Sequence, residues 1–242
     1  MKDILQDVVA HTHALGFLTL VKVTSEDSTT IESMAEDRSV IVTGETKTPV
    51  TEFSGVFGMP NLDKLALHLK NPEYQKDAKV EVVTAERNGE TIPTHIHFEN
   101  AGGDFENDYR FMNKQIIEEK LKSVKFKGAS WDVEFQPSMA SIQRMKLQAA
   151  AHSEETIFTV KTDNSNLVFL FGDQSTHAGE FIFEAGVQGE LSHAWSWPVA
   201  QVQSILNLDG DLTMSISSAG AMKITVDSGL VSYDYILPAQ SK

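Results

Sequence analysis

The feature of this sequence that most constrains its fold is a pattern that recurs four times along the chain. In each copy a short amphipathic helix precedes three runs rich in β-branched and aromatic residues. Apolar residues at a spacing near 3.6 predict the helices, and runs separated by turn residues predict the strands. The helices are expected at residues 2–15, 60–69, 138–151 and 198–206.

The four copies pair into two halves. The second helix of each half opens at a proline, Pro60 in the first half and Pro198 in the second. Four copies with the same internal order indicate a duplicated architecture. We expect an α+β protein of two similar domains, residues 1–113 and 131–242, with residues 114–130 as the linker. Strand pairs around 164–166 and 219–220 are expected to form hairpins.

The composition is that of a folded, soluble protein. Hydrophobic residues make up 41% of the 242 residues and charged residues 22%. The absence of cysteine excludes disulfides, thiolate metal sites and cysteine nucleophiles. The first residues lack the basic segment and apolar run of a signal peptide, and no apolar stretch approaches the roughly 18 residues of a membrane helix. We expect a cytoplasmic protein (in the host cell, if viral) with no membrane partner.

The net charge of −14 is distributed unevenly. Residues 1–109 carry 9 basic against 19 acidic residues, and residues 147–242 carry 3 against 11. Residues 110–146 reverse the balance, with 8 basic against 4 acidic residues. By its net charge the chain should repel nucleic acid. The basic middle segment on its own resembles a solvated linker, so charge does not decide the partner.

Two short motifs could serve other functions or have ordinary structural roles. His95 and His97 alternate on an expected strand and face the same side, as the ligands of a shared metal would. No carboxylate follows them at the spacing of a cupin site, so surface histidines are the preferred interpretation. Trp195 and Trp197 also share a strand face. They form either a sugar-stacking platform or, as we prefer, part of the core.

No catalytic motif is evident. The sequence has no recognisable Ser/His/Asp arrangement, no glycine-rich phosphate loop and no framed pair of carboxylates. We therefore expect a protein that is not an enzyme and that needs no metal or other cofactor.

The repeat, the linker and the C-terminal strands together resemble DNA sliding clamps of the T-even bacteriophage type, which are related in architecture to eukaryotic and archaeal clamps. The resemblance covers essentially the whole chain. It is most specific in residues 131–239, which include WDVEF at 131–135 and PSMASIQRMKLQAAAH at 137–152. The first half fits more loosely, through TIESMAEDRSVIV and PNLDKLALHLK.

The resemblance implies that three subunits close head to tail into a ring of six domains. A heterologous contact must close or polymerise, and pairing exposed strand edges between subunits would supply the joints. By analogy, the strand at 109–112 meets the strand at 180–183 of a neighbour. The interface residues implied are Tyr109, Phe111, Phe181 and Phe183.

The resemblance further implies that the helices line the central hole and face double-stranded DNA through water. Weak, sequence-independent phosphate contacts would permit sliding, and an acidic outer surface would keep DNA from sticking outside. The fourth helix carries no basic residue, so its DNA contacts are expected to be weak. The DNA-facing residues implied are Lys2, Lys64, His68, Lys70, Arg144 and Lys146.

The last implied site is a pocket that takes a short partner peptide with apolar anchors. The resemblance places it at Met34, Val40, Ile236, Leu237 and Pro238. The partners implied are a DNA polymerase, tethered for processive replication, and an ATP-dependent clamp loader. Two alternatives stay open at this point: a β-rich phage structural or carbohydrate-binding protein using Trp195 and Trp197, and a metalloenzyme using His95 and His97.

Overall fold

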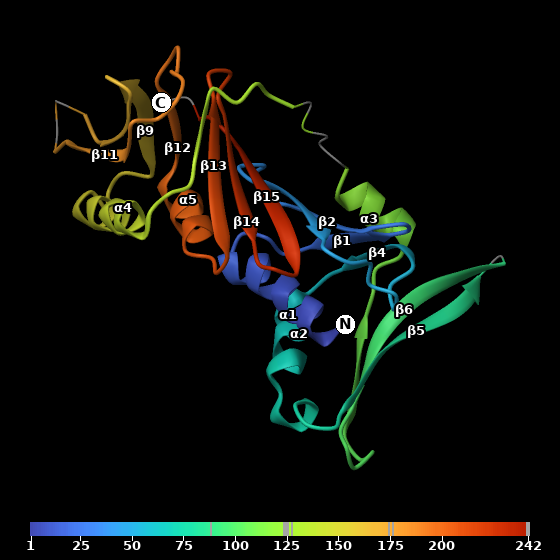
Figure 1. Cartoon of the computed structure of the whole chain (residues 1–242). Helices are drawn as coiled ribbons and strands as arrows, with labels where there is room; N and C mark the ends of the chain where they lie inside the picture. Colours follow the sequence, from blue (N-terminus) through green and yellow to red (C-terminus); the bar gives the residue numbers. More distant parts are fainter. Residues whose placement is uncertain (88, 123–125, 127, 174, 176, 241–242) are drawn as a thin grey trace. The chain divides into compact units, whose positions relative to one another are not determined.

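The computed structural model describes residues 1–242 except 88, 123–125, 127, 174, 176 and 241–242 (Figure 1). The chain forms two compact units. Unit 1 comprises Met1–Val124 and Ser228–Tyr233, and unit 2 comprises Lys125–Asp227 and Asp234–Lys242. In the described part of the chain, no helix has the length and hydropathy needed to cross a membrane.

Unit 1 alternates helices with short antiparallel strands. Strand β1 lies between β2 and β4, and β5, β6 and β7 form a separate three-stranded sheet. The elements are α1 (Lys2–His11), η1 (His13–Leu15), β1 (Val21–Ser25), β2 (Thr29–Met34), β3 (Ile41–Thr46), β4 (Gly55–Met59), α2 (Leu62–Lys70), η2 (Pro72–Tyr74), β5 (Lys79–Arg87), β6 (Glu90–Glu99), β7 (Glu106–Arg110) and α3 (Lys114–Lys120).

Unit 2 repeats this order. Four of its strands form one sheet in the order β11-β10-β9-β12, and β13 pairs with both β14 and β8. The elements are β8 (Val133–Phe135), α4 (Met139–Ala151), β9 (Ile157–Asp163), β10 (Asn166–Phe171), β11 (Gly179–Ala185), β12 (Trp195–Pro198), α5 (Val199–Leu206), β13 (Asp211–Ser217), β14 (Ala221–Asp227) and β15 (Val231–Pro238), of which residues 231–233 belong to unit 1.

The internal duplication extends to individual hydrogen bonds. In unit 1, β4 pairs with β1, and Gly58 forms an isolated bridge with Met112, just after β7. In unit 2, β12 pairs with β9, and Ser196 forms an isolated bridge with Gln240, just after β15. In both units the strand that precedes the second helix therefore ties the first strand to the end of the last. The predicted fold class, α+β with antiparallel sheets, is confirmed.

The four predicted helices are present with small differences at their ends. The first ends at His11 and is followed by a short 3-10 helix. Gly16 caps this 3-10 helix in the left-handed conformation, with a φ of 83° that favours glycine. Asn164 and Ser165 have φ values of 50° and 61°, the conformation of a two-residue type I′ turn. The predicted hairpin between β9 and β10 is thereby confirmed, as is the one between β13 and β14.

The expected linker begins with a helix that the periodicity of the sequence does not reveal. Helix α3 occupies 114–120, and the side chain of Asn113 caps it by accepting a hydrogen bond from the Ile116 amide at 3.0 Å. Ile117 is fully buried against β4, where a Cβ on Gly58 would lie 2.8 Å from its Cδ1. This packing places residues 114–120, the start of the expected linker, in unit 1.

A buried polar cluster ties the C-terminal strand of unit 1 to its first helix. The Tyr233 hydroxyl donates a hydrogen bond of 2.8 Å to the Asp7 carboxylate. The His11 ring stacks on the Tyr233 ring with centroids 4.7 Å apart, and both side chains are at least nine-tenths buried. The hydrogen bond joins residues 226 positions apart, so it fixes the two ends of unit 1 against each other.

Removing the Tyr233 hydroxyl should destabilise unit 1. Tyr233→Phe leaves a partly buried carboxylate short of one donor, and we expect a loss of about 1–3 kcal/mol in the free energy of unfolding. Urea denaturation measures this loss. A double-mutant cycle with Asp7→Ala isolates the pair. A coupling energy near zero would show that the hydrogen bond is not stabilising.

Candidate functional site

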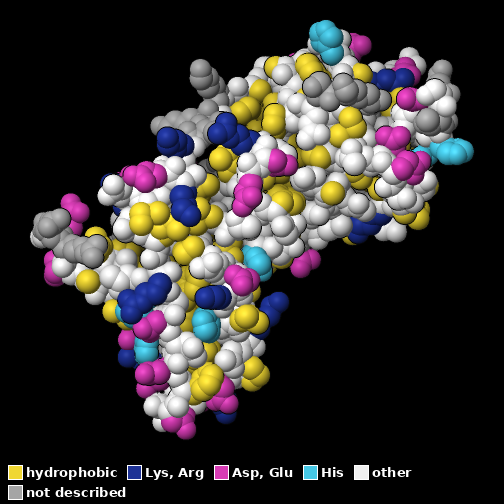
Figure 2. Space-filling view, turned by 180° about the vertical axis from the view of Figure 1, so that it is seen from behind, with side chains coloured by type: hydrophobic (Ala, Val, Ile, Leu, Met, Phe, Trp, Pro, Cys, Tyr) yellow, Lys and Arg dark blue, Asp and Glu magenta, His cyan; other side chains and the backbone are white. Residues whose placement is uncertain are grey.

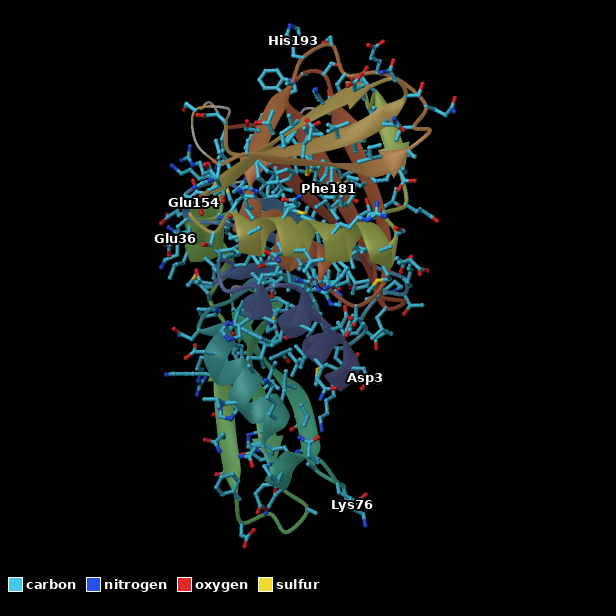
Figure 3. All side chains as sticks on the ribbon, turned by 90° about the vertical axis from the view of Figure 1, so that its left-hand side faces the viewer. Asp3, Glu36, Lys76, Glu154, Phe181 and His193 are labelled. Carbon is cyan, nitrogen blue, oxygen red and sulfur yellow. The ribbon has the colours of Figure 1, made fainter. Side chains whose placement is uncertain are left out.

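Helices α1 and α2 of unit 1 lie together and bury one face each. Helix α2 buries Leu62, Leu65, Ala66 and Leu69, whereas Lys64 and Lys70 are exposed. Leu67, which lies outside the buried stripe, is 68% exposed. Helices α1 and α2 contact each other (Figure 3), so their outer faces form one surface.

Unit 2 presents the matching pair α4 and α5. Arg144 is exposed on α4, while Lys146 is half-buried beside a groove of about 660 Å³ between α4 and α5. Met139 and Leu147 are 77% and 63% exposed on the same helix. The exposed face of α4 is therefore more apolar than a water-facing helix requires.

The four helices are electrostatically different from the rest of the chain. Helices α1, α2, α4 and α5 contain five basic residues and three acidic ones, Asp3, Asp7 and Asp63, whereas the whole chain has a net charge of −14. The basic residues are Lys2, Lys64, Lys70, Arg144 and Lys146. A surface with a positive balance on an acidic protein favours weak binding of a polyanion.

Two of the predicted DNA-facing residues have local roles. The Lys2 Nζ donates to the Tyr74 carbonyl at 2.7 Å and to Gln75 Oε1 at 3.2 Å, tying α1 to the turn after α2. His68 is half-buried, with its ring centroid 5.1 Å from that of Phe98. Burial, together with the charge of Lys64, lowers the pKa of His68. This histidine is therefore neutral at pH 7 and adds no positive charge to the surface.

The predicted pocket residues separate into accessible and buried ones. Met34 is half-exposed and lines a cavity of about 700 Å³ in unit 1, with Leu20, Leu62, Met112 and Leu121. Pro238 is also exposed. Val40, Ile236 and Leu237 are 0%, 7% and 0% exposed, because they are core residues of the strands and turns that carry them. A docking peptide would find no surface on these three side chains.

Strands β7 and β11 each have one edge with no partner among the described residues, as do the terminal strands β5 and β8. In the sheet order, β7 is terminal and pairs with β6 alone over Glu106–Arg110. Met112, which the sequence places on the same edge, is already paired with Gly58. Strand β11 is terminal in its sheet and pairs with β10 alone. An open strand edge is a template for pairing with another chain.

The predicted interface residues lie on or just after these two strands. Tyr109 and Phe183 are buried within their own units, and Phe111 and Phe181 are half-exposed. The Tyr109 hydroxyl donates to the Pro60 carbonyl, and burial raises the pKa of this phenol. Figure 3 labels Phe181 on β11, on the side of the sheet where α4 lies. Phe183 shares that face, because residues two apart on a strand point the same way.

The sequence-based prediction did not include the exposed apolar residues of β11 and of the helices that pack on these two sheets. Leu67 belongs to α2, which covers the β7 sheet, and Leu147 and Met139 belong to α4, which contacts β11. Ile182 lies on β11 itself and is 45% exposed. The sequence could have revealed Leu67, because this leucine falls outside the apolar stripe of α2 and so had to be exposed.

The two alternative sites are not supported by the geometry. Trp197 is fully buried and donates its indole hydrogen to the Leu237 carbonyl at 3.1 Å, so it offers no face to a sugar. His97 Nδ1 lies 2.9 Å from an Asp108 oxygen. Over the described residues, no group of three or more His, Cys, Asp or Glu side chains is arranged to hold a metal ion.

Solved structures of PCNA are similar to this chain over its whole length. PCNA of A. fulgidus, bound to the C-terminal region of FEN-1, has a TM-score of 0.68 at 12% identity, covering 100% of this chain and 95% of its own. PCNA from Thermococcus kodakaraensis has a TM-score of 0.67 at 8% identity, covering 99% and 97% of the two chains. This chain has the fold of a sliding clamp.

A third structure agrees. The Proliferating Cellular Nuclear Antigen of Entamoeba histolytica has a TM-score of 0.65 at 12% identity, covering 99% of this chain and 94% of its own. Neither a protein-family model nor a curated protein sequence matches the chain. The likeness to sliding clamps is therefore one of fold, and the narrower resemblance to phage clamps stays a prediction.

The neutrality of His68 on this clamp fold is directly measurable. We expect an NMR titration to give His68 a pKa below the usual histidine value, and Lys64→Gln to raise it. Because the folded state binds this proton less readily than the unfolded state, the free energy of unfolding should fall as pH drops below about 6.5. Lys70→Gln is the control and should leave the pKa of His68 unchanged.

Proposed function

We propose that the protein is a DNA sliding clamp, a ring of three copies that encircles duplex DNA and tethers a DNA polymerase. The observation that carries this proposal is the pair of open strand edges on β7 and β11. One lies in each unit, and each is backed by a helix with exposed apolar side chains. A head-to-tail contact between β7 of one copy and β11 of the next would cover both edges at once, and a ring is the closed form of such a contact.

The apolar residues fit the same arrangement. Leu67 on α2 accompanies β7, and Leu147 on α4 accompanies β11, so a β7–β11 joint brings the helix of one copy toward that of its neighbour. Burying these side chains would supply a hydrophobic contribution of about 25 cal/mol per Å² of apolar surface. This burial explains why both residues are apolar at positions that water covers in the single chain.

The helices would then face the centre of the ring. Their balance of five basic against three acidic residues, on a chain of net charge −14, favours weak phosphate contacts inside and repulsion of DNA outside. Such contacts do not read sequence and would allow the ring to slide. Lys64, Lys70 and Arg144 are the best placed, since all three are exposed.

Partner docking is assigned to the cavity beside Met34. Its apolar side chains and its volume of about 700 Å³ suit one or two anchors of a short peptide. The polymerase and an ATP-dependent loader are the partners proposed for it. In this function the protein performs no chemistry and needs no cofactor, because the loader supplies the energy that opens the ring.

Charge introduced at the joint should dissociate the ring. We expect the wild-type protein to have a solution mass near three times 26.7 kDa, and Leu67→Glu or Ile182→Glu to shift it toward one chain. Leu230→Glu is the matched control, since Leu230 is 40% exposed but lies on neither edge. Light scattering coupled to size exclusion measures the mass. A wild-type protein that is monomeric at every concentration would contradict the proposed ring.

Neutralising the helix cations should weaken DNA binding in a salt-dependent way. The triple variant Lys64→Gln, Lys70→Gln, Arg144→Gln should bind a short duplex less tightly, and the slope of log K against log salt should fall by roughly one unit for each phosphate left without its cation. Fluorescence anisotropy at several salt concentrations measures both quantities. A control triple variant at Lys47, Lys79 and Lys161, which lie off the helices, should match the wild type. Equal weakening in both variants would contradict the assigned surface.

A further inference from the structure

The outer face of the β5–β6–β7 sheet carries a ladder of charged and histidine side chains. On β6, His95, His97 and Glu99 alternate with the buried Ile96 and Phe98. The cross-strand neighbours form three rows: Lys79, Glu99 and Glu106; Glu81, His97 and Asp108; and Val83, His95 and Arg110. In the lower part of Figure 2, acidic, basic and histidine side chains lie close together.

His97 is surrounded by carboxylates from all three strands of its sheet. Its Nδ1 lies 2.9 Å from Asp108 Oδ1, and its Nε2 lies 3.8 Å from Glu99 and 3.9 Å from Glu106. Glu81 is its register partner on β5. Three carboxylates therefore lie within 4 Å of one imidazole, while Glu81 pairs with Lys79 at 2.7 Å. Glu99 stands directly opposite Glu106, where like charges repel.

His95 lies between a carboxylate, Asp108, and a guanidinium, Arg110. Its Nε2 lies 3.5 Å from Asp108, and its Nδ1 lies 3.4 Å from the Arg110 guanidinium. The hydrogen bond from His97, followed by the charges of His95, His97 and Arg110, lowers the pKa of Asp108, so this carboxylate stays ionised at mildly acidic pH. With both histidines neutral, only Lys79 and Arg110 offset the four carboxylates of the ladder.

The edge strand proposed to meet β7 is also acidic on its outer face. On β11, Phe181 and Phe183 point inward, whereas Glu180, Ile182 and Glu184 alternate with them. Pairing β7 with β11 of another copy brings Glu180 and Glu184 to the same face as Glu106 and Asp108. That face of the joint would hold these four carboxylates against one guanidinium, Arg110.

We infer that the subunit joint is pH-sensitive, and that protonation of His95 and His97 next to β7 tightens the ring. This inference rests on the proposed β7–β11 joint. Histidine is the side chain whose charge ordinarily changes between pH 5 and 8, and two added positive charges relieve the carboxylate repulsion on both sides of the joint. Since the joined state binds the protons more readily, the joint is strongest below the histidine titration range. It weakens as pH rises through that range, which makes opening easier.

The test is the trimer dissociation constant at pH 6.0 and pH 8.0, measured by sedimentation at constant ionic strength. The apparent constant for one joint should rise about three- to tenfold between the two pH values, the scale of a partly exposed charge interaction. The double variant His95→Gln, His97→Gln should lose most of this dependence. His193→Gln, on an exposed histidine of unit 2, is the control and should keep it.

A second variant tests the β11 side of the same joint. Glu180→Gln with Glu184→Gln removes carboxylates without touching the ladder, so it should tighten the ring at pH 8.0 and reduce the pH dependence. A wild-type ring whose dissociation constant is equal at both pH values would overturn the inference alone. So would equal dependence in the wild type and the double histidine variant. A protein that forms no trimer at either pH would overturn the ring itself, and this inference with it.

Discussion

The structure depends on one constraint: a short amphipathic helix cannot cover its own apolar stripe. Helices α1, α2, α4 and α5 have 8 to 13 residues, too few to be stable in water alone. Each therefore buries that stripe against neighbouring elements: α1 contacts α2, α4 contacts β11, and α5 contacts β12 and α4. The basic residues Lys64, Lys70 and Arg144 lie outside the buried stripes of α2 and α4 and are available to a polyanion, whereas α5 carries no charged residue.

This packing covers the faces of the sheets but leaves some strand edges unpaired. Within each unit, β4 and β12 close one side of the first sheet by pairing with β1 and β9. Strands β7 and β11 have no such neighbour in the described chain. Edge strands are commonly protected by charge, and here Glu106, Asp108, Glu180 and Glu184 lie along the two edges. Charges that discourage random pairing would also weaken the proposed β7–β11 pairing, and this is the basis for the proposed role of the titratable groups beside β7.

The buried polar contacts show which parts of the fold are fixed most firmly. Tyr233, Asp7 and His11 join the C-terminal strand to the first helix across almost the whole sequence. Lys2 holds the start of α1 to the turn after α2. These contacts fix the helix pair of unit 1 as one surface, so Lys64 and Lys70 keep a constant position beside α1.

The sequence alone determined the repeat, the four main helices and two hairpins, because these follow from local periodicity and turn residues such as Asn164 and Ser165. The clamp fold was expected from the resemblance to a known family. The sequence did not reveal α3, whose stability comes from Ile117 packing at Gly58. Nor did it separate Met34 from Val40, or show that His68 is neutral. Burial, edge exposure and the histidine ladder depend on which strands become neighbours, and only the tertiary structure decides this, since it brings together residues that no sequence spacing relates.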